Sequence, residues 1–283
     1  MECLRLQFKA PTAHYRVPFT YKVRQSYPIP PYSTVIGLLC NVLGIGETID
    51  AFLSQPFGLY IAGRFQSLTH EYTWLRNMKQ EEHIKRFKDR SRREIDQVPE
   101  HPGGQVPVTL DVLNEVETVV YLIHPCREIL MQIHDNLFYP EVWLSHLHLG
   151  RSEDWVVPEN ISVVTPLPSL EVEPIWTKDR GYYYWLPYPE DTWELDKWGN
   201  RKEYEELFRK AMGTPQLVTA LYRKVEEPKG NGEFWKIRNF NHIRAKICSG
   251  QVPLVEFGSL PKVLVDPDPE LMLPIFPACI LWR

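Results

Sequence analysis

The sequence has 283 residues, of which 43% are hydrophobic and 24% charged, and a formal net charge of −4 at pH 7. This composition fits one large or two modest globular domains and excludes a protein that is coated with nucleic acid on all sides, although a local basic surface is still allowed. We find no apolar leader and no run of about 18 apolar residues, so we expect no membrane span. Five scattered cysteines without a CxxC spacing predict reduced thiols of a cytoplasmic protein, with neither a disulfide framework nor a metal site.

The first predicted element is a strand. Residues 3–10 alternate between apolar and polar side chains, a pattern typical of a half-buried strand whose second face is polar and basic. The segment that follows, to about residue 32, is predicted to be a loop, and it carries several basic and tyrosine side chains.

A proline-rich segment then leads into an almost wholly apolar helix. The prolines within residues 28–31 hold the chain extended, and Ser33 or Thr34 can cap the helix by accepting hydrogen bonds from its first N–H groups. We expect this helix to be buried and to end near Leu43, with Gly44 as its C-cap. A rigid loop at a helix N-terminus favours an anion such as phosphate. The alternative is a purely structural turn before a core helix.

The middle of the chain predicts a projecting arm. Between Arg76 and Arg93, eight Lys or Arg residues face three acids, a local balance of +5. Gly103-Gly104 follows as a flexible tip, so that strand, charged excursion, glycine turn and strand describe a long hairpin. The alternative for the charged run is a solvated or disordered segment. The expected elements are a short helix near 49–53, strands at 58–67, 69–74 and 106–123, and a helix from Pro125 to Leu137.

The order of these elements predicts the fold class. Residues 1–150 give the order β-α-β-β-α-β, the ferredoxin-like arrangement, with the arm inserted in its middle. Beyond residue 150, prolines and short runs rich in Val, Ile, Tyr and Trp indicate strands joined by turns, with one helix at 201–212. We therefore predict an α+β protein with a ferredoxin-like domain at 1–150 and a β-rich domain at 151–283.

No pattern in the sequence predicts a cofactor site or a catalytic triad. His146 and His148 could lie on one face of a strand as metal ligands do, but no carboxylate or thiolate pattern accompanies them. The loop that contains His14, Tyr15, Lys22 and Tyr27 has the residue types that metal-free RNA cleavage requires, namely a base, an acid and a cation. Residue types without geometry are more typical of a loop that binds than of one that cuts.

Binding of single-stranded RNA is the activity that the pattern favours. A four-stranded sheet with basic and aromatic side chains on an open face holds RNA by stacking and by phosphate contacts. The alternatives are an ordinary solvated surface and a scaffold that bridges proteins only. The basic residues expected on or beside the open face are Arg5, Lys9, Arg16, Lys22, Arg24 and Arg64.

Three segments of the chain resemble a known family. Residues 10–18 (APTAHYRVP) and 26–39 (SYPIPPYSTVIGLL) resemble the Cas-five subunit of CRISPR-associated Cascade complexes. Residues 149–153 (LGRSE) resemble the second recurring signature of that family. Residues 1–60 carry most of the resemblance, and the proline-rich start is most similar to the type I-B branch.

The resemblance implies a RAMP-superfamily protein with a ferredoxin-like or RRM domain and a thumb at about residues 74–109. Such a subunit grips the 5′ handle of the CRISPR RNA (crRNA) and caps the Cascade backbone, in a cytoplasmic ribonucleoprotein complex for antiviral defence. The partners implied are crRNA, the backbone and large subunits, and target DNA near one end of the complex, without a membrane or a cofactor. The residues implied in RNA binding are Arg16, Tyr21, Lys22, Arg24, Tyr27, Tyr32, Ser33, Thr34, Arg64, Arg76, Lys79, Arg151 and Ser152.

The resemblance carries over no catalytic residue. One branch of the family cleaves precursor RNA, but its catalytic residues cannot be placed on this sequence, so we expect a binding subunit and not an enzyme. The alternative is a metal-independent endoribonuclease that processes precursor crRNA.

Overall fold

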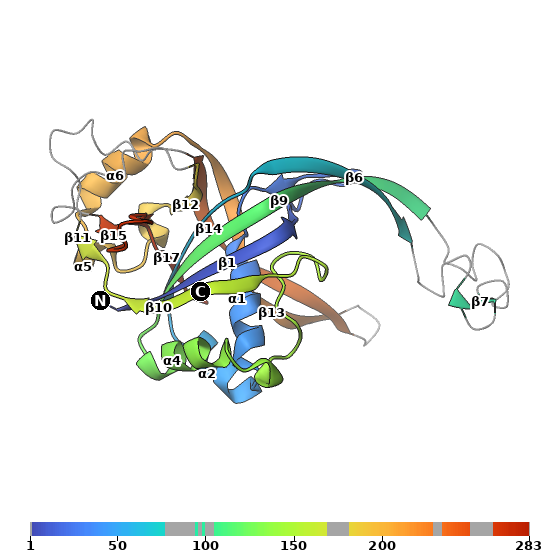
Figure 1. Ribbon diagram of the computed structural model, residues 1–283, viewed down its shortest axis with the longest axis horizontal. Coiled ribbons are helices and arrows are strands. Elements are labelled where there is room, and N and C mark those ends of the chain that lie inside the picture. The colour runs from blue at the N-terminus through green and yellow to red at the C-terminus, as the bar shows by residue number, and fades with distance from the viewer. Residues whose placement is uncertain are drawn as a thin grey trace.

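A large antiparallel sheet is built around the first strand (Figure 1). The computed structural model describes residues 2–76, 94–95, 98–99, 105–168, 181–228, 234–249 and 263–282. In it, β1 (Cys3–Ala13) pairs with β9 (Gln105–Ile123) on one side and with β10 (Val157–Val164) on the other. The far edge of β9 pairs with β5 (Phe57–Arg64).

Two helices complete the ferredoxin-like order. The helix α1 (Tyr32–Leu43) lies between β1 and β5 in the chain, and α4 (Arg127–Asn136) lies between β9 and β10. The strand order β10-β1-β9-β5 is that of a split β-α-β motif, so the predicted α+β class and ferredoxin-like arrangement are confirmed. The fourth strand, β10, begins only after residue 150, and the predicted domain boundary stays a prediction.

The remaining elements are mostly short, apart from two long strands near residues 213–249. They are β2 (Tyr15–Arg16), β3 (Val23–Arg24), β4 (Ser26–Tyr27), α2 (Gly46–Ser54), β6 (Ser67–Arg76), β7 (Glu94–Ile95), β8 (Val98–Pro99), η2 (Pro140–Val142), β11 (Leu167–Pro168), β12 (Tyr183–Pro187), η5 (Pro189–Asp191), α5 (Leu195–Trp198), α6 (Arg201–Lys210), β13 (Gly213–Pro228), β14 (Phe234–Ser249), β15 (Leu264–Val265), β16 (Pro274–Ile275) and β17 (Ala278–Ile280). None of the helices in the described ranges is long and apolar enough to cross a membrane.

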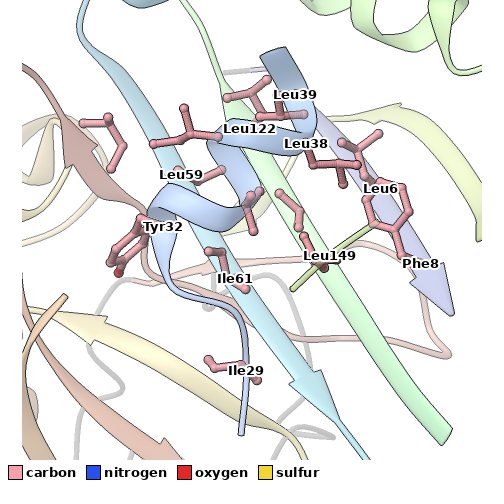
Figure 2. Close-up of a cluster of buried hydrophobic side chains, with 14 of the residues drawn as sticks. Leu6, Phe8, Ile29, Tyr32, Leu38, Leu39, Leu59, Ile61, Leu122 and Leu149 are labelled. Atoms are coloured by element: carbon pink, nitrogen blue, oxygen red, sulfur yellow. The ribbon is translucent and has the colours of Figure 1, made fainter. Parts of the chain in front are cut away.

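The helix α1 packs on one face of the sheet. Figure 2 shows Leu38 and Leu39 of α1 against Leu6 of β1 and Leu122 of β9, and all four side chains are at most 3% exposed. Burial of one such side chain stabilises the fold by about 1.5–3 kcal/mol. The alternating apolar residues of β1 therefore face the core as predicted.

The ends of α1 are set by backbone geometry. Gly44 has φ 70°, and its N–H donates to the Cys40 carbonyl at 3.2 Å, which confirms the predicted C-cap. The prediction of a hydroxyl N-cap is wrong, because the helix begins at Tyr32 and Pro31 holds the N-cap position without a side-chain hydrogen bond. Ser33 and Thr34 consequently lie inside the first turn.

Part of the second face of the sheet is buried, which overturns the expectation of an open basic face for Arg5. Lys9 and Arg64 on the same face stay exposed and pair with Glu159 and Glu117. Tyr60 and Tyr121 on this face are at most 1% exposed and belong to a cluster with Phe208 of α6 and Phe276. Arg5 is only 5% exposed, and its Nη1 donates to Asp266 Oδ1 at 3.0 Å and to Asp268 Oδ2 at 2.9 Å. The physical reason is that C-terminal segments cover the part of the face around Arg5 and supply the carboxylates that neutralise it.

Two long hairpins extend on the same side of the molecule (Figure 1). Strands β6 and β9 pair from Ser67↔Asn114 to Arg76↔Gln105, which confirms the strands of the predicted hairpin. The charged run at 77–93 and the glycine tip at 103–104 lie almost wholly outside the described residues, so the bounds of the arm stay a prediction. Strands β13 and β14 pair from Gly213↔Cys248 to Pro228↔Phe234 and form a second hairpin, which the sequence analysis did not predict.

Candidate nucleic-acid interface

A cleft of about 640 Å³ lies at the base of the two hairpins. Glu71 and Thr73 of β6 line one side, and Leu217 of β13 and Phe240 of β14 line another. The rest of the wall comes from the loop after β1, from the first turn of α1 and from the turn at residues 150–153. The predicted site residues that line the cleft are Arg16, Arg24, Tyr27, Ser33, Thr34 and Arg151. The fold thus brings together segments that are distant in the sequence.

Backbone pairing holds the loop after β1 in this wall. Strand β3 pairs in parallel with β9, with Arg24 opposite Leu110, and the Thr109 N–H donates to the Lys22 carbonyl at 2.9 Å. Strands β2 and β4 pair with each other, and the Tyr15 N–H donates to Ser26 Oγ at 2.8 Å. Arg24 is therefore presented from a strand and not from a free loop.

Arg16 and Arg24 are the cations of the cleft that have no acidic partner within the described ranges. The Nε of Arg24 is buried and has no hydrogen-bond partner there. Burial, and after it the charge of Arg16, lowers the pKa of Arg24. Arg16 is exposed, and among the described residues its guanidinium reaches only the Thr20 carbonyl, at 3.5 Å. An anion between these two guanidinium groups would relieve their repulsion and satisfy a buried donor.

Arg151, in contrast, is already ion-paired. Its Nε and Nη2 donate to the two oxygens of Asp154 at 3.0 and 2.8 Å, and its Nη1 lies 3.2 Å from Glu71 Oε2. Asp154 is fully buried and also accepts from the His14 N–H at 3.0 Å. Hydrogen bonding to Asp154 is the main reason that the pKa of Arg151 is raised. Arg151 thus fixes the turn that lines the cleft, with its charge neutralised.

Gly150 explains the glycine of the LGRSE segment. Its φ is +123°, a conformation that L side chains rarely adopt. A Cβ on Gly150 would lie 2.9 Å from Asp154 Oδ2 and 3.0 Å from the His14 carbonyl oxygen. Only glycine lets the turn approach the loop after β1 this closely.

Trp185 anchors the proline-rich segment from behind. Its indole N–H donates to the Pro30 carbonyl at 2.9 Å, and its ring lies 5.5 Å from the ring of Tyr27 and 6.3 Å from that of Tyr32. Tyr27 is 7% exposed and Tyr32 is fully buried, and burial raises the pKa of both phenols. The expectation of RNA contact for Tyr32 is corrected, because its side chain has no accessible surface.

The other predicted site residues lie outside the cleft lining. Tyr21 and Lys22 are exposed on the loop, and Ser152 is exposed with its Oγ donating to Glu153 Oε2 at 3.1 Å. Arg64 on β5 donates to Glu117 Oε2 at 2.7 Å and lies over the Tyr182 ring at 5.1 Å. Arg76 is the last residue of β6, and Lys79 lies outside the described residues.

The histidines near the cleft have different surroundings. His14 lines the cleft and is 5% exposed; its Nδ1 lies 2.7 Å from the Asp111 carbonyl, and its Nε2 has no partner in the described part of the chain. Burial is the main reason that the pKa of His14 is lowered. The rings of His146 and His148 lie 5.4 Å apart, and the described ranges contain no cluster of three or more metal-ligating side chains.

Comparison with known families identifies the first part of the chain. Residues 3–93 match a family model described as "CRISPR-associated protein (Cas_Cas5)". Residues 3–93, about a third of this chain, are similar to the Cas-five family. The match includes the loop after β1 and the first turn of α1, so the two unpaired arginines of the cleft lie within it.

Other known proteins give less information about this chain than the family model does. No curated protein sequence matches the chain. A solved structure titled "CRISPR RNA-guided surveillance complex" is 14% identical, with a TM-score of 0.47, and the alignment covers 89% of this chain and 92% of that one. A CRISPR protein from Archaeoglobus fulgidus is 12% identical, with a TM-score of 0.36, over 99% of this chain and 100% of the other. A type III-B Cmr-beta complex bound to cognate target RNA and AMPPnP is 13% identical, with a TM-score of 0.40, over 89% and 88%. We infer no shared function at these scores.

The Cas-five match ends before the part of the cleft that the sequence analysis missed. Leu217, Thr219 and Phe240 belong to the β13–β14 hairpin, far beyond residue 93. A signal for this hairpin exists in the sequence, since Gly230-Asn231-Gly232 lies between two long segments of strand character. The cleft is therefore built from the family segment together with a C-terminal hairpin.

Proposed function

We propose that this chain is a crRNA-binding subunit of a type I CRISPR Cascade complex, and that its cleft grips the 5′ handle of the guide RNA. The Cas-five match at residues 3–93 supports the CRISPR association. The position of the cleft supports the choice of binding site, because the matched segment supplies Arg16, Arg24 and the first turn of α1.

The observation that carries this proposal is that neither Arg16 nor Arg24 has an acidic partner in the described part of the chain. A half-buried guanidinium with a buried, unsatisfied Nε is unfavourable unless a ligand completes it. The phosphates of an RNA backbone supply the charge and the acceptor oxygens that this pair lacks. Ser33 and Thr34 line the same cleft at the N-terminal end of α1, where the helix dipole also favours an anion.

The test compares Arg24→Ala with the matched control Arg64→Ala. Arg64 is an exposed arginine on the same sheet, but it pairs with Glu117 outside the cleft. Fluorescence anisotropy with a labelled crRNA handle should show a loss of affinity of about ten-fold or more for Arg24→Ala, the size expected for a charge-assisted hydrogen bond. The slope of log K against log salt should also fall by about 1. Arg64→Ala should leave both quantities unchanged.

Unchanged handle affinity for Arg24→Ala, or equal losses for the two variants, would refute the cleft as the binding site. Arg24→Lys provides a further comparison. It keeps the charge but loses the planar donor fork, so it should recover part of the salt slope and little of the affinity.

The finer assignments are proposals of the same kind. We propose the Cascade backbone and large subunits as protein partners, target DNA near one end of the complex as a further contact, and type I-B as the subtype. Genes next to the one that encodes this chain test the subtype, and co-purification with the other Cascade subunits tests the partners.

We also propose that the chain binds RNA without cleaving it. His14 and Tyr15 line the cleft but are at most 5% exposed, whereas Lys22 lies outside the lining, so the three side chains do not converge on one exposed point. Incubation of the purified chain with repeat RNA in EDTA tests this proposal. Specific cleavage that is lost in His14→Ala would overturn it.

A further inference from the structure

The β13–β14 hairpin carries aromatic and basic side chains on one face. In a two-stranded ladder, residues directly opposite each other share a face, and so do residues two apart on one strand. Tyr222 is opposite Phe240, and Lys224 is opposite Arg238. Thr219 is opposite His242 on the same face, so Tyr222, Lys224, Arg238, Phe240 and His242 form a continuous row, here called the hairpin strip.

The strip is exposed and ordered by its own contacts. Tyr222 is 49% exposed and Phe240 is 45% exposed. The Tyr222 and Phe240 rings lie 6.1 Å apart, and the Phe240 and His242 rings are also 6.1 Å apart. The Arg238 guanidinium lies over the Tyr222 ring at 4.9 Å. Accessible π faces thus alternate with cations along the hairpin.

The opposite face of the hairpin is used by the fold. Val218 and Ile243, which pair with each other, are at most 3% exposed and belong to the core, and Leu221 packs against it. Further along, Arg223 lies over the Trp282 ring at 4.2 Å. One face of the hairpin therefore holds it to the body of the protein, and the other presents the strip to solvent.

The strip continues the wall of the cleft. Phe240 lines the cleft together with Leu217 and Thr219, and Tyr222, Lys224 and Arg238 follow it outward along the hairpin. We infer that the hairpin strip binds single-stranded RNA that leaves the cleft, with bases stacked on Tyr222 and Phe240 and with Lys224 and Arg238 on the phosphates. This inference rests on the proposed function, because it takes the cleft as the place where the RNA enters.

The charges of the strip favour RNA over a protein partner. In the described part of the chain, Lys224 and Arg238 form no ion pair, unlike Arg244 further back, which pairs with Asp191 at 2.8 Å and Glu190 at 3.3 Å. Unpaired cations beside stacked aromatic rings are the usual surface for single strands, where stacking tolerates any base. The core of a protein interface, in contrast, is depleted in charge.

The test uses two RNAs that share the same handle, one of about 8 nucleotides and one extended to about 16, within the site sizes of single-strand binding folds. Tyr222→Ala should weaken binding of the longer RNA about five-fold or more, the effect of losing one stacked base, and leave the shorter RNA unchanged. Tyr222→Phe keeps the ring and should bind both RNAs as the unaltered chain does. Ile237→Ala, at a side chain 36% exposed on the opposite face, is the matched control.

The outcomes separate this inference from the proposed function. If Tyr222→Ala binds both RNAs normally, the inference that the hairpin strip binds RNA is overturned. The effect of Arg24→Ala on the same RNAs reports on the cleft independently. A loss confined to a DNA strand of the same sequence would overturn the assignment to RNA. Normal RNA binding with lost assembly of the complex would make the strip a protein interface instead. Circular dichroism and a thermal midpoint changed by no more than about 2 °C confirm that each variant is folded.

Discussion

Replacement of the buried Asp154 by alanine should cost more stability than any surface change near the cleft. Its carboxylate accepts hydrogen bonds from the backbone N–H groups of His14 at 3.0 Å and Arg151 at 2.9 Å. It also accepts from the Arg151 guanidinium at 3.0 and 2.8 Å. Asp154→Ala therefore leaves two backbone donors without their acceptor and separates one ion pair.

The magnitude follows from these contacts. Each backbone donor left unsatisfied costs about 1 kcal/mol or more, and the charge-assisted bonds to Arg151 contribute about 1.5–3 kcal/mol. The lower part of that range applies to Arg151, since its side chain is 18% exposed and keeps Glu71 as a partner. The free energy of unfolding should fall by about 4 kcal/mol in total, within the range for the loss of one member of a buried pair.

Urea denaturation followed by circular dichroism measures this loss. With an m-value of about 3 kcal/mol/M, the midpoint should fall by about 1.3 M urea. The matched control is Glu153→Ala. Glu153 is the adjacent acid, but its side chain is 62% exposed and its carboxylate is farther from the Arg151 guanidinium, at 3.5 Å compared with 2.8 Å for Asp154. That change should stay within about 0.5 kcal/mol. A loss below about 1 kcal/mol for Asp154→Ala, or similar losses for both variants, would refute the account of the turn.

Two further predictions concern titratable groups. Burial lowers the pKa of His14 below its ordinary 6.5, so the unfolded chain binds this proton more readily than the folded chain does, and the stability that neutral His14 gives should be lost as pH falls from about 7 to 5. Denaturation at both pH values should show that the free energy of unfolding depends less on pH in His14→Gln than in the unaltered chain. The same pH dependence in both proteins would contradict this prediction. Burial raises the pKa of Cys3 to about 12 and of Cys40 and Cys248 to about 11. These thiols should react with Ellman's reagent only as the protein unfolds, since the thiolate is the reactive form. Single Cys→Ser variants show which thiol is labelled. Rapid labelling of any of the three in the native protein would be evidence against its burial.

The first part of the fold was predictable because its signals are local. The alternation in β1 and the apolar run of α1 each report burial on one face or on all faces, and Gly44 marks a helix end by its own conformation. Ferredoxin-like order then follows from the sequence of elements alone. The arm was also predictable, since β6 and β9 alternate on both sides of a charged excursion.

The covered second face of the sheet was not predictable in the same way. Arg5 has the pattern of a solvated residue in a half-buried strand, and the residue that neutralises it, Asp266, is 261 positions away. Local periodicity contains no information about such a pairing. The same limit explains Tyr32, which lies in a proline-rich segment rich in polar groups yet packs against Trp185 from a distant strand.

The residues of the candidate site likewise include some that the sequence could indicate and some that depend on distant contacts in the fold. Arg16 and Arg24 could be chosen from the sequence because they are basic residues in a loop of a recognisable segment. That Arg151 would be neutralised by Asp154 depends on the turn geometry at Gly150, and that Phe240 would join the cleft depends on the path of a hairpin over 200 residues later.

The bridge between Arg5 and Asp266 also constrains the order of events during synthesis. The first strand emerges from the ribosome with a guanidinium on a face that becomes buried in the folded protein, and its carboxylate partner is made 261 residues later. Until then β1 can pair with its neighbours only while this face stays in water. A nascent chain halted before residue 263 should therefore expose the face that holds Tyr60 and Tyr121 and depend on chaperones, and the long sequence separation should make the final docking step slow.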